Sequence, residues 1–218
     1  MCLCSLTVLS SALKISDPHY SESRVLSAQL LLRGDLRNDP TASLASVTNV
    51  LQDGIQSIRF GVPTLPPMAF TQFCLKYVDE CKPQRLVFRG GRLKLTNRRW
   101  AELENVNRAV NASIRPERNK EGLAGEKWLL SPAFGDCNDF AVTKRHQLIA
   151  RGWPARAVLL SEVVTVSGEH HLVAVVRTDG GDLVLDNLTD RIMPWFQKSY
   201  QWVRIQTPKN PNYWASST

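Results

Sequence analysis

The chemically most suggestive residue of this chain is a cysteine that stands directly before an amphipathic stretch. Cys137 lies in the run Gly135-Asp136-Cys137-Asn138-Asp139, and the residues that follow predict a helix over residues 139–150. A thiol at that place points at the unpaired backbone N–H groups and the positive end of the helix dipole, and both favour the nucleophilic thiolate. The alternative interpretation is a buried structural cysteine, with Asp136 as the cap of the helix.

A thiolate nucleophile also needs a base, and the histidines of the chain offer few choices. His19 lies in a polar segment and His146 on the predicted helix, whereas His170 and His171 open a predicted strand. Consecutive strand residues point to opposite faces of a sheet, so only one of the last two can face the helix.

The hairpin that follows decides between these two histidines. Asp179-Gly180 is typical of a type I′ turn, and as a two-residue loop it pairs Thr178 with Gly181. In that register His171 lies on the same face as Asp186, at a diagonal position where an imidazole can reach a carboxylate. A loop shifted by one residue would leave the two groups too far apart, so the register is itself a prediction.

Together Cys137, His171 and Asp186 have the types and order of a nucleophile, a base and an acid that orients the base. The acid would fix the tautomer of the imidazole, the imidazole would polarise the thiol, and the backbone N–H of Cys137 would stabilise an oxyanion. His170 then faces away. The alternative is a histidine pair at a strand end and an ordinary turn at Asp186-Asn187.

The elements that must position these residues divide the chain into a helical part and a β-rich part. The sequence pattern predicts helices over residues 41–58, 70–80 and 96–114, a loop at 63–67 and a strand at 85–95. After the helix at 139–150, β-rich runs separated by turn residues follow at 157–166, 170–177, 183–185 and 200–206. One helix followed by an antiparallel meander indicates an α+β fold rather than a wound parallel sheet.

Composition narrows the functional classes. The chain has 218 residues, 43% hydrophobic and 22% charged, with a net charge of +7, so one globular domain with appendages is expected. Its basic residues are scattered and no nucleic-acid-binding motif accompanies them, so we expect no nucleic-acid partner. No stretch approaches the roughly 18 apolar residues that a membrane-spanning helix needs, so we expect no membrane span.

The candidate residues sit in longer runs that resemble the bacterial transglutaminase-like cysteine proteinases. The likeness covers about residues 96–214 and includes Gly135-Asp136-Cys137-Asn138-Asp139-Phe140-Ala141, Gly152-Trp153-Pro154, Gly168-Glu169-His170-His171 and Leu185-Asp186-Asn187. The resemblance implies a papain-like α+β fold, with N-terminal helices packed on an antiparallel sheet and the nucleophile at the N-terminus of a central helix. It also implies that Cys137, His171 and Asp186 hydrolyse a peptide bond.

The family includes calcium-dependent periplasmic proteases that release surface adhesins. In those members acidic residues beside the cysteine bind calcium, which here implies Asp136 and Asp139. Two residues depart from the pattern. Asn138 stands where the family usually has an acid, which replaces one charged oxygen ligand by a neutral amide, and His170 replaces a small residue beside the catalytic histidine.

Export of the family implies a periplasmic or secreted location. Members usually have a cysteine pair near positions 74 and 81, so Cys74 and Cys81 are expected to form a disulfide. An unbroken helix would separate them by about 10.5 Å, so the helix must break between them. Residues 1–12 are apolar but lack the basic start of a secretory signal, and they are either a truncated export signal or a flexible arm.

These observations predict a signal-like segment and connector over residues 1–35 and one domain over 36–218, with a helical part at 36–135 and the catalytic helix and β-meander at 136–218. The expected function is that of a cysteine endopeptidase acting on an exported or surface protein, with calcium as the one metal to consider and no cofactor required for the chemistry. Two alternatives stay open: transglutaminase-type acyl transfer to an amine, and a catalytically silent peptide-binding module. The sequence does not name the substrate or a regulatory partner protein.

Overall fold

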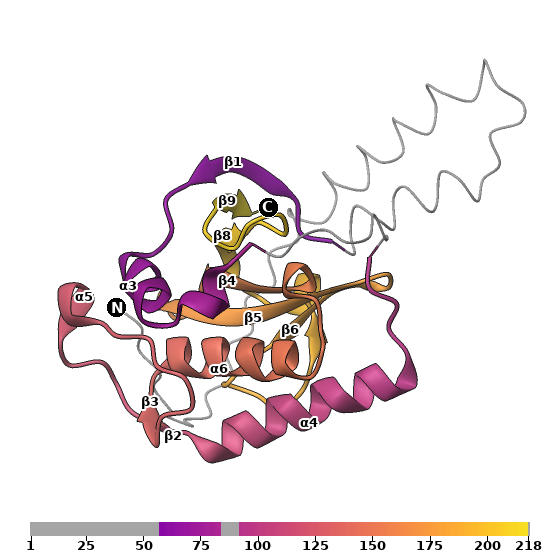
Figure 1. Ribbon diagram of the computed structural model, residues 1–218, viewed down its shortest axis with the longest axis horizontal. Coiled ribbons are helices and arrows are strands. Elements are labelled where there is room, and N and C mark those ends of the chain that lie inside the picture. Colours follow the sequence, from indigo (N-terminus) through magenta and orange to yellow (C-terminus); the bar gives the residue numbers. More distant parts are fainter. Residues whose placement is uncertain (1–56, 84–91, 218) are drawn as a thin grey trace, which may run out of the picture. The chain divides into compact units, whose positions relative to one another are not determined.

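The computed structural model describes residues 57–83 and 92–217 (Figure 1). The helix expected over 41–58 and the strand expected over 85–95 therefore lie almost wholly outside the described residues, as does the segment 1–35. The helices that can be described are α3 (Met68–Lys76), α4 (Asn97–Ser113), the single turn α5 (Gly122–Gly125) and α6 (Cys137–Ala150). No helix in these ranges is long and apolar enough to cross a membrane.

A seven-stranded antiparallel sheet, in the order β1-β9-β8-β4-β5-β6-β7, forms the body of the fold. Its strands are β1 (Phe60–Thr64), β4 (Val158–Val164), β5 (His170–Thr178), β6 (Gly181–Leu185), β7 (Met193–Pro194), β8 (Gln201–Gln206) and β9 (Trp214–Ser217). A separate two-residue pair, β2 (Arg115–Pro116) with β3 (Phe134–Gly135), runs parallel and leads the chain into α6. The four expected β-rich runs correspond to β4, β5, β6 and β8, which confirms the α+β class.

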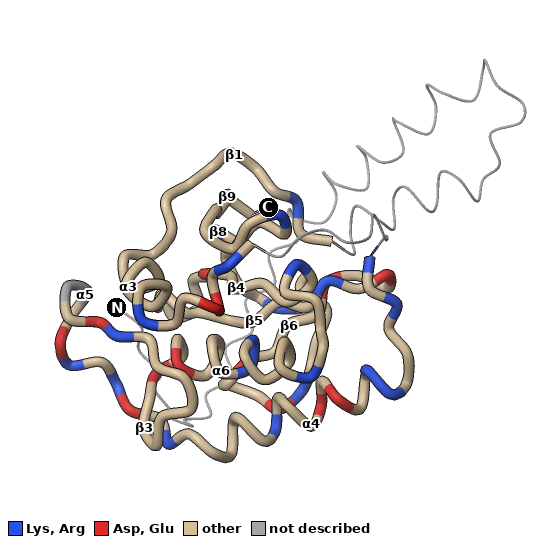
Figure 2. The backbone as a smooth tube through the Cα atoms, in the orientation of Figure 1, with Lys and Arg blue, Asp and Glu red and all other residues tan. Residues whose placement is uncertain are grey.

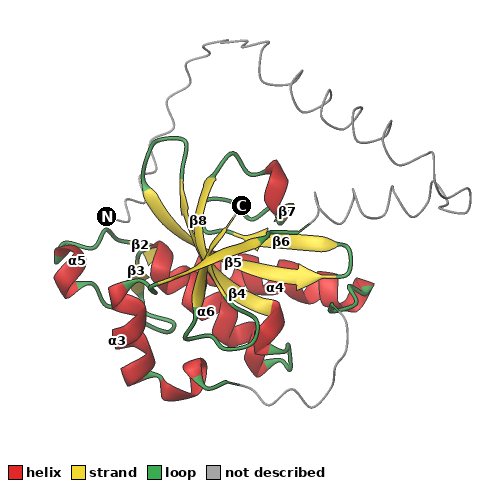
Figure 3. Ribbon diagram, turned by 90° about the horizontal axis from the view of Figure 1, so that it is seen from above, coloured by secondary structure: helices red, strands yellow, loops and turns green. Residues whose placement is uncertain are grey.

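Helix α6 lies along one face of this sheet, and α4 packs on the side of α6 that faces away from the sheet (Figures 1 and 3). Leu103, Val106 and Val110 give α4 an apolar stripe, and they meet Phe140 and Leu148 of α6 in one buried cluster. Burial of apolar side chains on this scale dominates folding energetics, at about 25 cal/mol per Å². Thr96 caps α4 by accepting a hydrogen bond from Arg99 N–H, as a helix of this length needs at its start.

Three strands of the sheet are missing from the sequence prediction: β1, β9 and the two-residue β7. Pro63 and Thr64 were expected in a loop, but they end β1, which pairs with β9 at the edge of the sheet. Proline is tolerated in an edge strand because one side of such a strand makes no ladder hydrogen bonds. The short β9 begins at the buried Trp214, and its four residues are too few to give an alternating pattern.

The hairpin between β5 and β6 has the predicted register but not the predicted turn type. Thr178 pairs with Gly181, and the ladder continues to Ala174 opposite Leu185. The positive φ falls on Gly181 (114°) rather than on Asp179 or Gly180, so the turn is not of type I′. A glycine supplies this conformation at little cost, and the pairing that sets the face of each side chain is unchanged.

Cys74 and Cys81 form a disulfide, as the resemblance implied. Helix α3 ends at Lys76 and a separate 3₁₀ turn, η1 (Val78–Cys81), follows, so the helix does break between the two cysteines. The break brings their Cα atoms to 5.5 Å, within the range that a disulfide requires.

Charged side chains do not gather by sign on the segment between α4 and α6. Figure 2 shows Lys and Arg there interleaved with Asp and Glu, and further basic residues along α4. Neighbouring charges of opposite sign cancel over short distances in salt, so this segment presents little net field to a distant partner.

The N-terminus of α6 is built by two acidic residues. Asp136 accepts a hydrogen bond from the N–H of Asn138 (2.9 Å), and Oδ2 of Asp139 accepts one from the N–H of Asp136 (3.0 Å). Oδ1 of Asp139 accepts a third from the N–H of Leu129 (2.6 Å), so the same carboxylate anchors the preceding loop. Gly135 packs directly on it, because a Cβ there would lie 2.3 Å from Oδ2 of Asp139.

Substitution of Gly135 by alanine should therefore destabilise the start of α6. The added methyl group needs the space of a carboxylate that two backbone hydrogen bonds hold in place, and overpacking of this kind costs about 1–3 kcal/mol. The measurement is urea unfolding of Gly135→Ala, with Gly180→Ala as the matched control, since a Cβ at Gly180 would meet Thr178 Oγ1 at an ordinary 3.8 Å. Equal stability of the two variants would contradict this account.

Candidate active site

Cys137 is the first residue of α6 and is completely buried. The helix was expected to begin at Asp139, but the cap at Asp136 places its start two residues earlier. The side chain thus lies at the helix N-terminus, where the dipole is positive, as the sequence predicted. The structure has Cys137 as a disulfide-bonded cysteine rather than a thiol, so thiol chemistry at this position first requires its reduction.

Three buried or half-buried carboxyl groups lie around this helix start, and burial is the main cause that raises the pKa of each. Burial raises the pKa of Asp139 to about 7, and the charges of Asp136 and Glu126 add to the rise against the hydrogen bonds from backbone N–H groups. Burial likewise raises the pKa of Asp136 and of Glu126. Glu126 also accepts a hydrogen bond from the Nδ2 group of Asn138. Burial therefore makes these carboxyl groups hold their protons more tightly than carboxyl groups in water do.

His171 and Asp186 are in direct contact. The Nε2 atom of the imidazole lies 2.9 Å from Oδ1 of the carboxylate, and both side chains are buried. The contact follows from the β5–β6 register, which places the two residues on one face of the sheet. Residue types and strand register thus predicted both partners of this pair and the hairpin that joins them.

Alternation along β5 groups His171 with the residues on the face of the sheet opposite α6, whereas the sequence pattern predicted that it faces this helix. Leu172 lies in a buried cluster that contains α6 residues, and Val173 in the cluster on the other face. By the same alternation His171 belongs with Val173, and its ring lies edge-on to Tyr200 of that second cluster, 6.0 Å between ring centroids.

Cys137 nevertheless lies next to residues that border His171. Cys137 and Leu172 share one buried cluster. Asn138, which follows the cysteine, lines the same cavity as His171. Burial raises the pKa of Asp136, which precedes the cysteine, and the charge of His171 acts against that rise. The direct contact of the sulfur with the imidazole stays a prediction.

His170 borders the same cavity instead of facing away from it. Its Nδ1 atom lies 2.7 Å from Oε1 of Glu162 on the neighbouring strand β4, and Oε2 of that glutamate pairs with Arg204 of β8. About half of the His170 side chain is exposed. The residue therefore joins a polar network at the rim, which a sequence argument based on alternation alone does not reveal.

Two residues that the sequence analysis did not consider complete the surroundings of Asp186. Lys198 Nζ and the Tyr200 hydroxyl each donate a hydrogen bond to Oδ2, both at 2.6 Å. Burial alone would raise the pKa of Asp186, but His171 and then Lys198 hold that pKa well below its usual range. Asp186 is thus ionised and acts only as an acceptor, so the Nε2 atom of His171 must carry the proton they share.

Helix α4 also reaches this pair through two asparagines. Asn111 Nδ2 donates to the backbone carbonyl of Asp186 (3.1 Å) and to the carboxylate of Asp190 (2.8 Å). Asn107, which is fully buried, donates to the carbonyl of Asp190 (3.0 Å). A polar residue on the apolar stripe of α4 was the available signal, since a buried amide needs a partner.

A cavity of about 330 Å³ opens beside His171. Pro67, Met68 and Ala69 at the start of α3 form its apolar wall together with Trp128 and Leu172, and Glu126 and Glu162 lie on its polar side. A segment from the first half of the chain thus contributes a wall of the cavity that contains His171.

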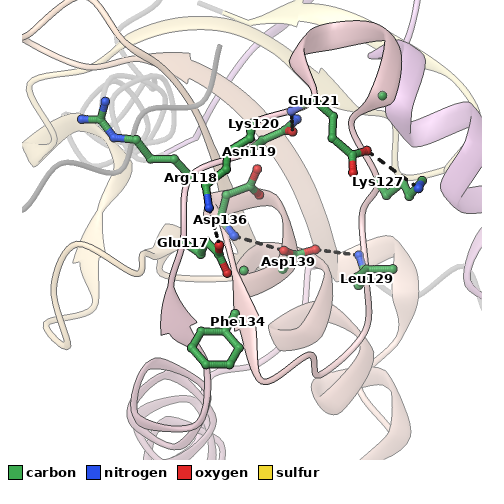
Figure 4. A pocket seen from close by; sticks show the side chains of 12 residues that line it. Glu117, Arg118, Asn119, Lys120, Glu121, Lys127, Leu129, Phe134, Asp136 and Asp139 are labelled. Carbon is green, nitrogen blue, oxygen red and sulfur yellow. Dashed lines mark hydrogen bonds and ion pairs between the residues drawn. The ribbon is translucent and has the colours of Figure 1, made fainter.

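A second cavity, of about 280 Å³, borders the start of α6 (Figure 4). Asp136 and Asp139 border it with Glu117, Glu121 and Lys127. The hydrogen bonds of Asp139 with Asp136 and with Leu129 join residues that line this cavity. Carboxylate oxygens are the ligand type that calcium prefers, and a divalent cation would offset the repulsion of Asp139 by Asp136. In the described part of the chain no three Asp, Glu, His or Cys side chains are already gathered as a metal site. An ion held by Asp136 and Asp139 therefore needs further oxygens from backbone or water.

Comparison with known proteins gives the family of this chain. LapG of Legionella pneumophila is similar in structure. Its calcium-bound form is 22% identical with a TM-score of 0.47, and the match covers 53% of this chain and 68% of that one. Its EGTA-treated form is 24% identical with a TM-score of 0.45, and that match covers 53% of this chain and 66% of the LapG chain. The search of curated proteins gives no match. The family model of the bacterial transglutaminase-like cysteine proteinases matches residues 60–218, most of the chain. This protein therefore belongs to the bacterial transglutaminase-like cysteine proteinases, a family of cysteine proteases.

Proposed function

We propose that this protein hydrolyses a peptide bond in an exported or surface protein, with Cys137 as nucleophile, His171 as base and Asp186 as the acid that orients the base. The observation that carries the proposal is the hydrogen bond between His171 and an ionised, buried Asp186. Because Asp186 can only accept, Nε2 of His171 is the protonated nitrogen and Nδ1 is left with a lone pair for a thiol proton. This is the tautomer that a Cys-His pair requires.

The reaction then proceeds through a thioester. His171 takes the proton of reduced Cys137, and the sulfur attacks the carbonyl carbon of the scissile peptide bond. The carbonyl oxygen gains negative charge, which the positive end of α6 stabilises. Collapse of this intermediate breaks the C–N bond, and the amine leaves with the proton from His171. Water, deprotonated by the same imidazole, hydrolyses the thioester and frees the sulfur.

The cavity beside His171 supports a polypeptide substrate. Its volume of about 330 Å³ has room for two or three side chains. Its lining is partly apolar and also includes the acids Glu126 and Glu162. Met68 is largely exposed at the edge of this cavity. An extended segment of a protein can lie against this wall and bring its backbone carbonyl to the start of α6.

An extracytoplasmic location is part of the proposal. The Cys74–Cys81 bond supports it, because structural disulfides persist in oxidising compartments such as the periplasm. The substrate would accordingly be a protein that is itself exported or displayed at the surface.

Calcium is proposed as a ligand of Asp136 and Asp139, beside the nucleophile. Bound there, it would supply positive charge to a corner where burial raises the pKa of both carboxyl groups and the charge of Asp136 adds to the rise at Asp139. The residues themselves cap α6 and hold the loop at Leu129 through hydrogen bonds that already exist. Asn138 contributes a neutral amide, so two charged ligands rather than three would come from this run of residues.

The triad is tested by single substitutions in the reduced protein. Cys137→Ala should abolish cleavage of a mixed-sequence fluorogenic peptide library, and His171→Ala should lower it by roughly a thousandfold or more, because the nucleophile and its base act as a unit. His170→Ala is the matched control, and it should keep far more activity than His171→Ala. Cleavage products are identified by mass spectrometry, and iodoacetamide labelling reports whether His171 activates Cys137.

Three results would count against the proposal. Undiminished cleavage by Cys137→Ala would exclude the nucleophile, and equal losses in the two histidine variants would exclude the assignment of the base. Incorporation of a labelled amine into a glutamine peptide, without release of fragments, would assign acyl transfer instead of hydrolysis.

Calcium binding is tested by stability rather than by activity. We expect calcium, but not magnesium, to raise the midpoint of thermal unfolding by several degrees, since a ligand at a hundred times its dissociation constant adds about 2.7 kcal/mol. Asp139→Asn should abolish the calcium effect, Asn138→Asp should enlarge it, and Asp79→Asn, an exposed acid outside this cavity, should leave it intact. An identical midpoint in calcium and in EGTA would show that these acids do not bind the ion.

A further inference from the structure

The buried carboxylate of Asp186 accepts hydrogen bonds on both oxygens. Oδ1 receives His171 Nε2 (2.9 Å) and the backbone N–H of Leu188 (3.1 Å). Oδ2 receives Lys198 Nζ and the hydroxyl of Tyr200, each at 2.6 Å. The half of the carboxylate that faces away from the imidazole is therefore held by two donors of its own.

These two donors come from one short segment with a fixed backbone. Lys198 directly follows the 3₁₀ turn η3 (Trp195–Gln197), and Tyr200 directly precedes β8. The N–H of Lys198 donates to the carbonyl of Trp195 (3.2 Å), and the N–H of Tyr200 donates to the carbonyl of Lys198 (2.8 Å). Both side chains thus contact the same oxygen from one hydrogen-bonded turn, so a movement of this turn would displace both of them.

The burial of Lys198 indicates that its charge has a role beyond holding the turn. The side chain of Lys198 is 9% exposed, and a charged group so far from water is costly unless it is paired and hydrogen-bonded. Its partner is the acid of the proposed triad. A lysine needed only to fasten this turn could have stayed in solvent, as Lys82 does in its pair with the exposed Asp79 at the same 2.6 Å.

We propose that Lys198 and Tyr200 are positioning residues of the active site: they fix Oδ2 of Asp186 so that Oδ1 stays aimed at His171, and Lys198 neutralises the carboxylate. The proposal rests on the proposed function, since it assigns the support of the same Asp186. Tyr200 acts in a second way, because its ring stands edge-on to the imidazole at 6.0 Å and limits how far that ring can turn. A carboxylate bonded on one oxygen only could rotate about its Cβ–Cγ bond, and the imidazole would then lose its fixed orientation.

Kinetics of the reduced protein test this role. Tyr200→Phe removes one hydroxyl and Lys198→Met removes the charge but keeps the stem, and each should lower kcat by about tenfold with KM little changed, since a hydrogen bond to a charged group is lost. Lys198→Arg should recover part of that loss. The probe is the library peptide that the wild-type protein cleaves fastest, and circular dichroism and thermal unfolding show that each variant is folded, so that misfolded protein does not enter kcat.

Matched controls remove the same groups elsewhere. Lys82→Met breaks an exposed lysine–aspartate pair of equal length, and Tyr213→Phe removes the hydroxyl of an exposed tyrosine. Both should keep the wild-type kcat. Wild-type kcat in Lys198→Met and Tyr200→Phe as well would overturn the proposal.

A spectroscopic measurement separates failure of this proposal from failure of the proposed function. Nitrogen NMR of the His171 ring, recorded on Cys137→Ser protein, needs no turnover. We expect an Nε2-bound proton protected from exchange, and its exchange should quicken about tenfold or more in Tyr200→Phe and Lys198→Met. An unchanged ring signal in both variants overturns the positioning role, whereas absence of any cleavage by wild-type protein overturns the protease assignment alone.

Discussion

A buried, ionised carboxylate is the constraint on which the rest of this site depends. Removal of the ionised Asp186 from solvent costs free energy. Four hydrogen-bond donors from three parts of the chain compensate this cost. The sheet supplies the imidazole, the turn after β6 supplies a backbone N–H, and the segment before β8 supplies a cation and a hydroxyl. Helix α4 holds the backbone of the same residue through Asn111. Each donor reaches Asp186 only when the segment that carries it is folded in its place. The geometry of the site therefore depends on the correct folding of all three segments.

The start of α6 places opposing electrostatic effects on the nucleophile. The helix dipole, equivalent to about half a positive charge, favours a thiolate at Cys137. The acids that cap the helix lie beside it and disfavour further negative charge. Burial resolves part of this conflict, because it raises the pKa of Asp139 to about 7 and so leaves a share of that carboxyl neutral near neutral pH. The cap and the nucleophile can therefore coexist in one helical turn, and a cation held by the same acids would act in the same direction.

The sequence could predict what depends on local pattern and register. The order of Cys137, His171 and Asp186, the helix after the cysteine and the pairing of Thr178 with Gly181 follow from residue types and spacing, and the pairing is confirmed even though the turn type is wrong. Lys198 and Tyr200 could not be found in this way, because nothing local distinguishes a lysine that enters the core from one that stays in solvent. His170 shows the same limit, since its partner Glu162 lies on a neighbouring strand and the cavity that it borders is formed by distant segments.

The charges of the proposed site form a balanced set only when Lys198 is included. Proton transfer from the thiol to His171 would create a thiolate and an imidazolium next to an ionised Asp186, which together carry one net negative charge in a buried region. Lys198 at 2.6 Å from the carboxylate brings the sum to zero. Since a buried charge is tolerated when it is paired, the lysine allows the active ion pair to form without an unbalanced charge in the interior. Asp186 holds His171 through Oδ1 and bonds Lys198 and Tyr200 through Oδ2, so it orients the imidazole while the lysine balances its charge. The base can then return its proton to the leaving amine, which the cleavage step requires.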